Sequence, residues 1–169
     1  MPKFVKYIVS AGRVVEESAL PRSIGELVNI RASQINGCGA CLDMHVKDAA
    51  AAGETPLRLS LVAAWRETTV FTDAERAALE LTERATRLAD SRGIDDAVWA
   101  DVAAHFDEEQ LAALVARIAL INTFNRMNVL MQEKGGSYDP ARRADVVAAV
   151  ASGSDPTRVG SEPAAASHS

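Results

Sequence analysis

The sequence predicts an all-α fold, on three observations. Alanine, leucine, glutamate and arginine are abundant, and β-branched residues seldom occur in runs, which favours helices over strands. Apolar residues recur every three or four positions through most of the chain. Capping residues and glycines interrupt these stretches at helical lengths. We therefore expect a helical domain over residues 1–136, a C-terminal helix over 137–151, and a disordered tail over 152–169.

Composition limits the kinds of partner. The 169 residues suffice for one domain with a sizeable core, and hydrophobic residues make up 48% of them. The formal net charge is -5 and no block of basic residues occurs, so we expect no binding to nucleic acid or to an anionic membrane. No apolar run approaches the length of a membrane span, and no signal peptide is evident. These features predict a cytoplasmic protein.

The first half of the chain is expected to form four helices. Apolar spacing predicts one helix over 3–17 and, after a break, a second over 22–35. A third opens near Cys38 and continues to about residue 52, where a glycine follows as a stop signal. Thr55 followed by proline then predicts a fourth, which reaches about residue 67.

The second half contains the strongest capping signals. Residues 72–75 read Thr-Asp-Ala-Glu, a capping box that predicts a long helix to about residue 91. A short helix begins at residue 95 or 96. Residues 107–110 then cap the longest apolar segment, which we expect to be the central core helix and to end at Gly135-Gly136.

One stretch, QINGCGACLDMH over residues 34–45, holds both cysteines and one of the three histidines. Cys38, Cys41 and His45 are spaced i, i+3, i+7, so on a helix they share one face. The Asn-Gly pair just before them marks a helix start. Inside a cell, a close cysteine pair is more often catalytic or metal-binding than a structural staple.

Redox chemistry is the first interpretation of this face. A thiol reacts as its thiolate, and a helix N-terminus and a neighbouring sulfur both favour that form. His45 lies one turn beyond Cys41, where it can take or return a proton. The two-residue gap permits a reversible disulfide. Such a pair can reduce a peroxide, because one thiolate attacks the O–O bond and the other thiol resolves the sulfenic acid.

Two other interpretations stay open from spacing alone. Zinc would accept Cys38, Cys41 and His45, but a closed site needs a fourth ligand, from His105 or a carboxylate. The plainest alternative is a pair of small buried residues near a core histidine.

Polar residues on two other helices need explanation. Glu26 lies away from the main apolar stripe of the second helix, and periodicity alone places it in water. Three asparagines interrupt the longest apolar segment. They either hydrogen-bond across an interface or are capping or exposed residues: Asn122, Asn125 and Asn128.

The cysteine stretch resembles the signature of the alkylhydroperoxidase AhpD-like proteins, which belong to the carboxymuconolactone decarboxylase superfamily. The residues that carry the resemblance are SQINGCGACLDMH, at 33–45. The likeness extends to residues 63–68, 71–79 and 118–126, and it covers roughly residues 6–129. This combination is far more specific than a lone CxxC.

The resemblance implies an all-α homo-oligomer, commonly a trimer or a hexamer built as a dimer of trimers. It implies a redox CxxC without a bound cofactor, a small-molecule peroxide as substrate, and a dithiol or thioredoxin-like reductant. Cys38 and Cys41 match the family's cysteine pair, and His45 matches its relay histidine. A glutamate one helix upstream completes the family's proton relay. Glu26 matches that glutamate, so the resemblance turns it toward the cysteines.

We therefore expect a thiol-dependent peroxidase or disulfide oxidoreductase. Cys41 is expected to attack, because it lies one turn from His45, and Cys38 to resolve. Some full alkylhydroperoxidases carry a second histidine where this chain has Ala40. A decarboxylase-type lyase is the enzymatic alternative, although the superfamily's decarboxylases generally lack the CxxC. A zinc-binding or scaffold oligomer is the alternative without enzyme activity.

Overall fold

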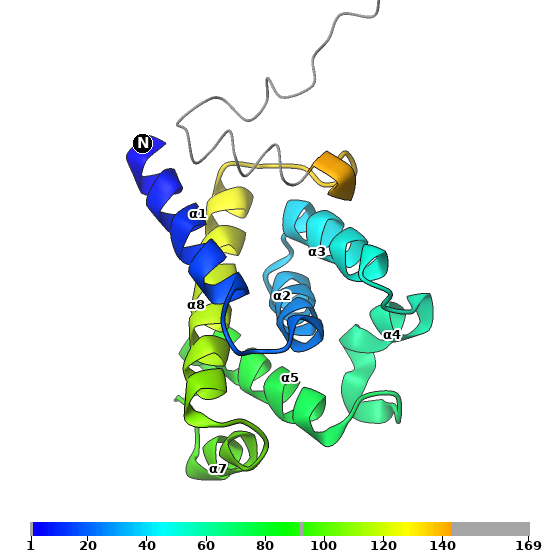
Figure 1. Ribbon diagram of the computed structural model, residues 1–169, viewed down its shortest axis with the longest axis vertical. Helices are drawn as coiled ribbons and strands as arrows, with labels where there is room; N and C mark the ends of the chain where they lie inside the picture. Colours follow the sequence, from blue (N-terminus) through cyan, green and yellow to red (C-terminus); the bar gives the residue numbers. More distant parts are fainter. Residues whose placement is uncertain (1, 92, 143–169) are drawn as a thin grey trace, which may run out of the picture.

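The computed structural model describes residues 2–91 and 93–142. Every regular element in this part of the chain is a helix, which confirms the all-α prediction (Figure 1). None of the helices found there is long and apolar enough to cross a membrane. In chain order the elements are α1 (Pro2–Glu16), α2 (Arg22–Asn36), α3 (Gly39–Ala51), α4 (Pro56–Leu61), the 3-10 helix η1 (Val62–Glu67), α5 (Asp73–Thr86), α6 (Leu88–Ser91), α7 (Asp96–His105), α8 (Glu108–Leu130) and the 3-10 helix η2 (Pro140–Arg142).

Helix α2 occupies the centre of the molecule, with α3, α5 and α8 packed around it (Figure 1). The hydrophobic core has two main clusters, and α2 contributes to both. One cluster joins α2 to α5, α7 and α8 through residues such as Val28 and Leu114. The other joins α2 to α3, η1 and α5 through Ile30 and Trp65. A third, small cluster contains both cysteines together with Ala32 and Ile121, so α2 and α8 enclose the CxxC.

The predicted caps are present. The Thr72 hydroxyl accepts a hydrogen bond from the Glu75 backbone N–H, and the Glu75 side chain accepts one from the Thr72 backbone. Asp107 and Gln110 form the same reciprocal pair at the start of α8. Thr55 caps α4. Each motif satisfies backbone N–H groups that a helix start otherwise leaves unpaired, which is why these starts are readable in the sequence.

Two predicted helices are interrupted. The helix predicted up to residue 67 becomes α4 followed by η1, with a non-helical backbone at Ala64 (φ -119°, ψ 27°). This break lets Trp65 turn into the core, where only 4% of its surface is exposed. The helix predicted up to residue 91 divides at Arg87 into α5 and α6. Apolar spacing continues across both breaks, so it cannot reveal them.

Helix α8 ends at Leu130, before the glycine pair that was expected to end it. The following segment, residues 131–142, is called the strap here. It crosses α3 and ends in η2 (Figure 1). The Asp43 carboxylate accepts the backbone N–H groups of Gly136 (2.6 Å) and Tyr138 (3.0 Å). A side chain at Gly135 would collide with the Gly39 carbonyl, so this glycine provides a close backbone contact.

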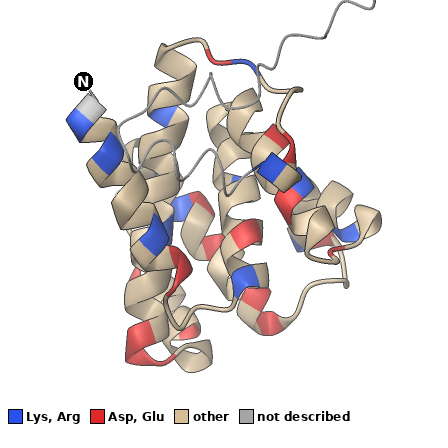
Figure 2. Cartoon of the chain, turned by 45° about the horizontal axis from the view of Figure 1, so that its top comes forward, with Lys and Arg blue, Asp and Glu red and all other residues tan. Residues whose placement is uncertain are grey.

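The predicted C-terminal helix over 137–151 is described only up to residue 142, and its remainder and the predicted tail over 152–169 lie outside the described residues. In the view of Figure 2, lysine and arginine residues are spread over several helices and interleaved with aspartate and glutamate residues.

Candidate active site

The CxxC lies at the turn between α2 and α3. Gly37 adopts a left-handed conformation (φ 66°), which ends α2 as glycines commonly do. Cys38 follows in an extended conformation and is the N-cap residue of α3. The Cys38 backbone N–H donates to the Ser33 carbonyl at 3.0 Å, which closes the turn. This local geometry places both cysteines at the N-terminus of α3, as the Asn-Gly signal predicts.

A disulfide joins Cys38 to Cys41, whose Cα atoms lie 5.4 Å apart. Both residues are 1% exposed. The Cys38 sulfur accepts the backbone N–H of Cys41 at 3.3 Å, at the positive end of the α3 dipole. The Cys41 sulfur accepts a different donor, the side-chain amide of Asn128 on α8, also at 3.3 Å. Each sulfur therefore has its own hydrogen-bond donor.

His45 lies one turn beyond Cys41 on α3, and it is buried against α2. Its Nδ1 atom lies 2.8 Å from a carboxylate oxygen of Glu26. The side-chain amide of Asn29 lies 3.3 Å from the same nitrogen. His45 and Glu26 are each 7% exposed. The structure thus brings together two of the residues singled out in the sequence, from two different helices.

The periodicity-based prediction that Glu26 is in water is wrong. Because α2 is surrounded by other helices, its polar side faces α3 instead of solvent. A single amphipathic pattern assumes that one face of a helix is exposed, and a central helix breaks that assumption. The family resemblance, which turned Glu26 toward the cysteine helix, matches the observed position.

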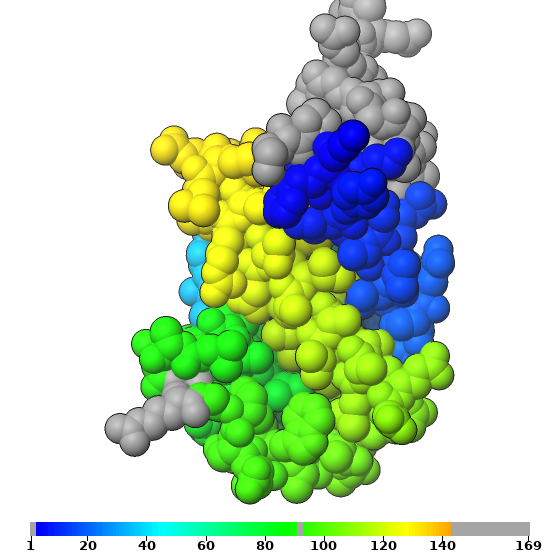
Figure 3. Space-filling view, turned by 90° about the vertical axis from the view of Figure 1, so that its left-hand side faces the viewer, coloured from blue at the N-terminus to red at the C-terminus, as the bar shows by residue number. Residues whose placement is uncertain are grey.

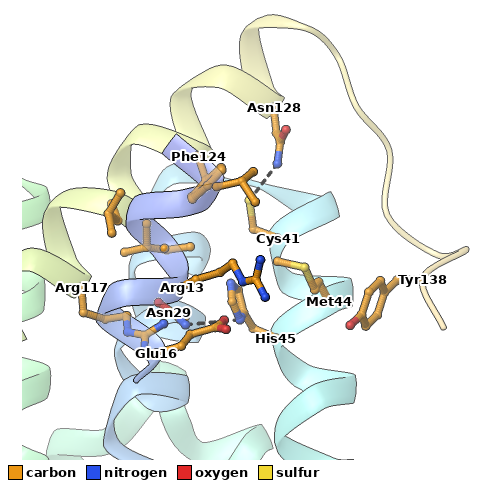
Figure 4. Close-up of a pocket in the computed structure, with 14 residues that line it drawn as sticks. Arg13, Glu16, Asn29, Cys41, Met44, His45, Arg117, Phe124, Asn128 and Tyr138 are labelled. Carbon is orange, nitrogen blue, oxygen red and sulfur yellow. Dashed lines mark hydrogen bonds between the residues drawn. The ribbon is translucent and has the colours of Figure 1, made fainter. Parts of the chain in front are cut away.

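A cavity of about 220 Å³ opens over this site, between α1, α3, α8 and the strap (Figure 4). Cys41 and His45 both line it, whereas Cys38 is not among the described residues that do. Met44, Leu120 and Phe124 contribute to its mainly apolar wall. The charged residues in its lining are Arg13, Glu16 and Arg117.

The asparagines of α8 hydrogen-bond to neighbouring helices, the first of the two alternatives for them: Asn122 and Asn125 to α2, and Asn128 to α3. Asn36, at the end of α2, donates to the side-chain oxygens of Asn122 and Asn125, both at 2.9 Å. Asn125 in turn donates to the Ser33 hydroxyl at 3.0 Å. Asn128 continues the series and reaches the Cys41 sulfur. Sequence reasoning left Asn128 out of the site, although its three-residue spacing from Asn125 places it on the same face.

His105, considered as the fourth zinc ligand, lies away from Cys38, Cys41 and His45. His105 ends α7, where its nearest carboxylate is Asp101 at 3.9 Å. Helix α7 packs on α5 and α8, away from the cysteines (Figure 1). Over residues 2–91 and 93–142, no group of three or more His, Cys, Asp and Glu side chains is arranged to hold a metal ion.

Two proteins of known sequence align with most of this chain. The family model described as the carboxymuconolactone decarboxylase family matches residues 2–84. YdfG of Bacillus subtilis is 38% identical over 136 residues, which cover 80% of this chain and 92% of that protein. YnjA of Escherichia coli K12 is 35% identical over 131 residues, or 76% of this chain and 71% of that one.

A solved structure gives the same relationship. Protein ATU0492 of Agrobacterium tumefaciens, provisionally assigned as the antioxidant defence protein AhpD, superposes with a TM-score of 0.78 and 32% sequence identity. The match covers 82% of this chain and 94% of that one. The fold therefore carries a CxxC disulfide in a scaffold shared with an AhpD-like protein, which supports a redox role. The chain belongs to the carboxymuconolactone decarboxylase family, as an AhpD-like member.

Proposed function

We propose that this protein is a thiol-dependent peroxidase that reduces organic hydroperoxides with electrons from a dithiol. One observation carries the proposal. Cys41 shares a cavity with His45, and His45 is itself hydrogen-bonded to the buried carboxylate of Glu26. A reactive sulfur, a proton acceptor and a group that orients that acceptor are the parts that an activated nucleophile requires.

Cys41 is assigned as the attacking thiolate, because it faces the cavity and Cys38 does not. When the Nδ1–H of His45 is donated to Glu26, the other ring nitrogen is left to accept the Cys41 thiol proton. The thiolate then attacks the terminal oxygen of the hydroperoxide, and the O–O bond breaks. Cys41 becomes a sulfenic acid, and the leaving alkoxide takes the proton from His45 and departs as an alcohol.

Cys38 is assigned as the resolving thiol. Its thiolate attacks the Cys41 sulfur and forms the observed disulfide, and the displaced hydroxide takes up a proton and leaves as water. The backbone N–H of Cys41 and the α3 dipole stabilise negative charge on the Cys38 sulfur. A dithiol then returns two electrons. Its thiolate attacks Cys41 through the cavity, Cys38 leaves as a thiolate, and the second thiol of the donor releases Cys41.

The cavity favours a particular kind of peroxide. A mainly apolar wall, with Met44, Leu120 and Phe124, rewards the burial of an apolar group, and about 220 Å³ accommodates a small organic molecule. We therefore expect organic hydroperoxides to react with a higher kcat/KM than hydrogen peroxide does.

The direct test is the consumption of cumene hydroperoxide with dithiothreitol as reductant. The wild-type protein is expected to turn over, and replacement of both Cys38 and Cys41 by serine to abolish turnover. Turnover that survives the double replacement would contradict the proposal. The lyase alternative instead predicts turnover of a γ-lactone acid that is indifferent to thiol alkylation.

A homo-oligomer is part of the proposal. Large apolar side chains are exposed along α1 and at the end of α8, which lie side by side in Figure 3. Exposed apolar clusters of this kind are typical of subunit contacts. The residues concerned are Phe4, Tyr7, Val14, Val129 and Leu130.

A further inference from the structure

Asn128 contacts the sulfur that the proposed function makes reactive. It is the last of three asparagines spaced three residues apart on α8, and the first two hydrogen-bond to side chains of the helical scaffold. Asn122 donates to Thr86 at 3.1 Å, and Asn125 donates to Ser33 at 3.0 Å. Asn128 instead donates to the Cys41 Sγ atom at 3.3 Å. Its side chain also lines the cavity over the site, as Figure 4 shows.

We propose that Asn128 is a further catalytic residue, whose side-chain amide stabilises the thiolate of Cys41 and thereby helps to make this cysteine the one that attacks. The role of Asn128 in turnover rests on the proposed function. The hydrogen bond from Asn128 to Cys41 is present whatever the substrate is.

The chemistry of the two groups gives the contact its direction. The amide nitrogen is a donor, and a thiolate accepts hydrogen bonds far better than a neutral sulfur does. The hydrogen bond therefore strengthens when the disulfide is reduced and Cys41 ionises. Cys41 is 1% exposed and Asn128 is only partly exposed, so water competes weakly for the donor.

The position of Asn128 is fixed by the fold. It lies in the last turn of α8, and its backbone carbonyl accepts the N–H of Glu133 at 2.9 Å, where the strap begins. The strap is held in turn by Asp43 of α3, the helix that carries Cys41. The amide is therefore presented to the sulfur from a rigid element, as a catalytic donor requires.

Other titratable groups line the same cavity as the Cys41 sulfur. The cavity lining includes titratable or charged side chains from each neighbouring element: Arg13 and Glu16 from α1, His45 from α3, Arg117 from α8 and Tyr138 from the strap. Glu26, on α2, contacts His45. A substitution at Asn128 leaves this set unchanged, so its effect isolates the amide.

The two sulfurs provide an internal comparison. The donor to Cys38 is a backbone N–H of α3, which no substitution at Asn128 removes. Loss of the Asn128 amide should therefore raise the pKa of the Cys41 thiol and leave that of the Cys38 thiol unchanged. Unequal effects on two cysteines three residues apart cannot arise from a general loosening of the fold.

The experiment titrates each reduced thiol by its thiolate absorbance near 240 nm. In a Cys38→Ser background, Asn128→Leu is expected to raise the Cys41 pKa by about one unit. Asn128→Asp should raise it further, because a carboxylate repels the thiolate. In a Cys41→Ser background, Asn128→Leu should leave the Cys38 pKa unchanged. If Asn128→Leu fails to fold, Asn128→Ala decides, because it also removes the amide and adds no charge.

The proposal is overturned if the Cys41 pKa is the same with and without the amide, or if both thiols move equally. The kcat/KM of each Asn128 variant in the otherwise wild-type chain should rise with pH later than that of the unsubstituted protein, by the same shift as the thiol. A shifted titration in a protein that consumes no peroxide would contradict the proposed function alone.

Discussion

Glu26 and His45 are an ionisable pair that the fold buries between α2 and α3. Placing such groups away from water costs free energy unless they are paired, and their 2.8 Å contact supplies the partner. The pair lies beside the Cys38–Cys41 disulfide, which supports the proposed role of both residues. At the scale of single residues, the proposed chemistry depends on how this pair orients the histidine.

Glu26→Gln tests that dependence with little change in shape. The amide keeps a hydrogen-bonding oxygen near His45 but removes the negative charge beside the imidazole. We expect peroxide turnover to fall about tenfold or more and the pH dependence of kcat to change. Circular dichroism should show that the fold is preserved. Glu109→Gln, an exposed change at the start of α8, is the control. Unchanged rates across the pH range would remove Glu26 from the mechanism.

Three of the four candidate site residues can be predicted from their spacing. Cys38 is the N-cap of α3, and Cys41 and His45 follow on successive turns of that helix. Glu26 cannot be predicted in this way, since its contact with His45 depends on how two helices pack. Asn128 lies 87 residues from Cys41 in sequence, and no local pattern connects such a pair. Local spacing identified the site, and tertiary packing supplied its partners.

At the scale of elements, Glu83 connects α5 to α2 and η1. Its carboxylate accepts hydrogen bonds from Arg31 (2.6 Å), from Trp65 (2.9 Å) and from Arg66. Burial acts to raise the pKa of Glu83, but the hydrogen bonds from Arg66, Trp65 and Arg31 outweigh it and hold the pKa below its ordinary value. The non-helical backbone at Ala64, inside η1, comes just before Trp65 and Arg66, whose side chains reach this carboxylate.

Glu83→Gln should therefore destabilise the protein more than the loss of a surface charge does. Three guanidinium groups, those of Arg31, Arg66 and Arg87, lose a buried counter-ion. We expect the free energy of unfolding in urea to fall by about 2–4 kcal/mol. The depressed pKa adds a pH signature. The stabilising contribution of Glu83 is present above the unfolded-state pKa and is lost as the pH falls through the lower folded-state pKa.

Glu80→Gln is the matched control, because Glu80 pairs with Arg66 and Arg84 near the surface. It should cost less than about 1 kcal/mol. Equal losses in the two variants would show that the carboxylate of Glu83 has no special part in joining these helices.

The strap is a second element held in part by one carboxylate, that of Asp43; Lys47 and Asp48 also hydrogen-bond to it. The hydrogen bond from Lys47, followed by those from the Tyr138 and Gly136 backbones, lowers the pKa of Asp43 to about 2. Because its pKa is lowered, the ionised Asp43 carboxylate stabilises the docked strap at every pH above the ordinary carboxyl pKa. This stabilisation should disappear as the pH falls from about 4 to about 2.

Hydrogen exchange at the backbone amides of Gly136 and Tyr138 measures this loss directly. After correction for the intrinsic pH dependence of exchange, their protection should fall within that window. In Asp43→Asn, which cannot ionise, protection should be low throughout and nearly independent of pH. Full protection of both amides below pH 2 would show that another contact holds the strap.

Element starts were more predictable than element ends. Caps such as Thr72 and Asp107 act within one turn, so the sequence states them directly. The end of α8 at Leu130 was not predictable from Gly135-Gly136. There the Gly135 backbone packs against the Gly39 carbonyl, far away in sequence, instead of ending a helix. A glycine can end a helix or permit a close backbone contact, and only the packing of the folded chain shows which of these roles Gly135 has.

At the scale of the whole molecule, the chain exposes large apolar side chains that contacts between subunits would cover. Tyr7 and Val14 on α1 are 69% and 70% exposed, and Leu130 at the end of α8 is 81% exposed. The family resemblance implies a trimer or a hexamer, so light scattering of the 169-residue chain should give three or six times its 18.0 kDa mass. Val14→Glu with Tyr7→Glu should lower that mass. A concentration-independent mass of a single chain would contradict the proposed oligomer.

The central claim is that Cys38 and Cys41 together reduce one peroxide per cycle. The most direct measurement counts free thiols in the fully reduced protein before and after one equivalent of cumene hydroperoxide. We predict two free thiols per chain before, none after, one equivalent of alcohol released, and an intramolecular Cys38–Cys41 disulfide in the peptide map. Two thiols still free beside unreacted peroxide would contradict it.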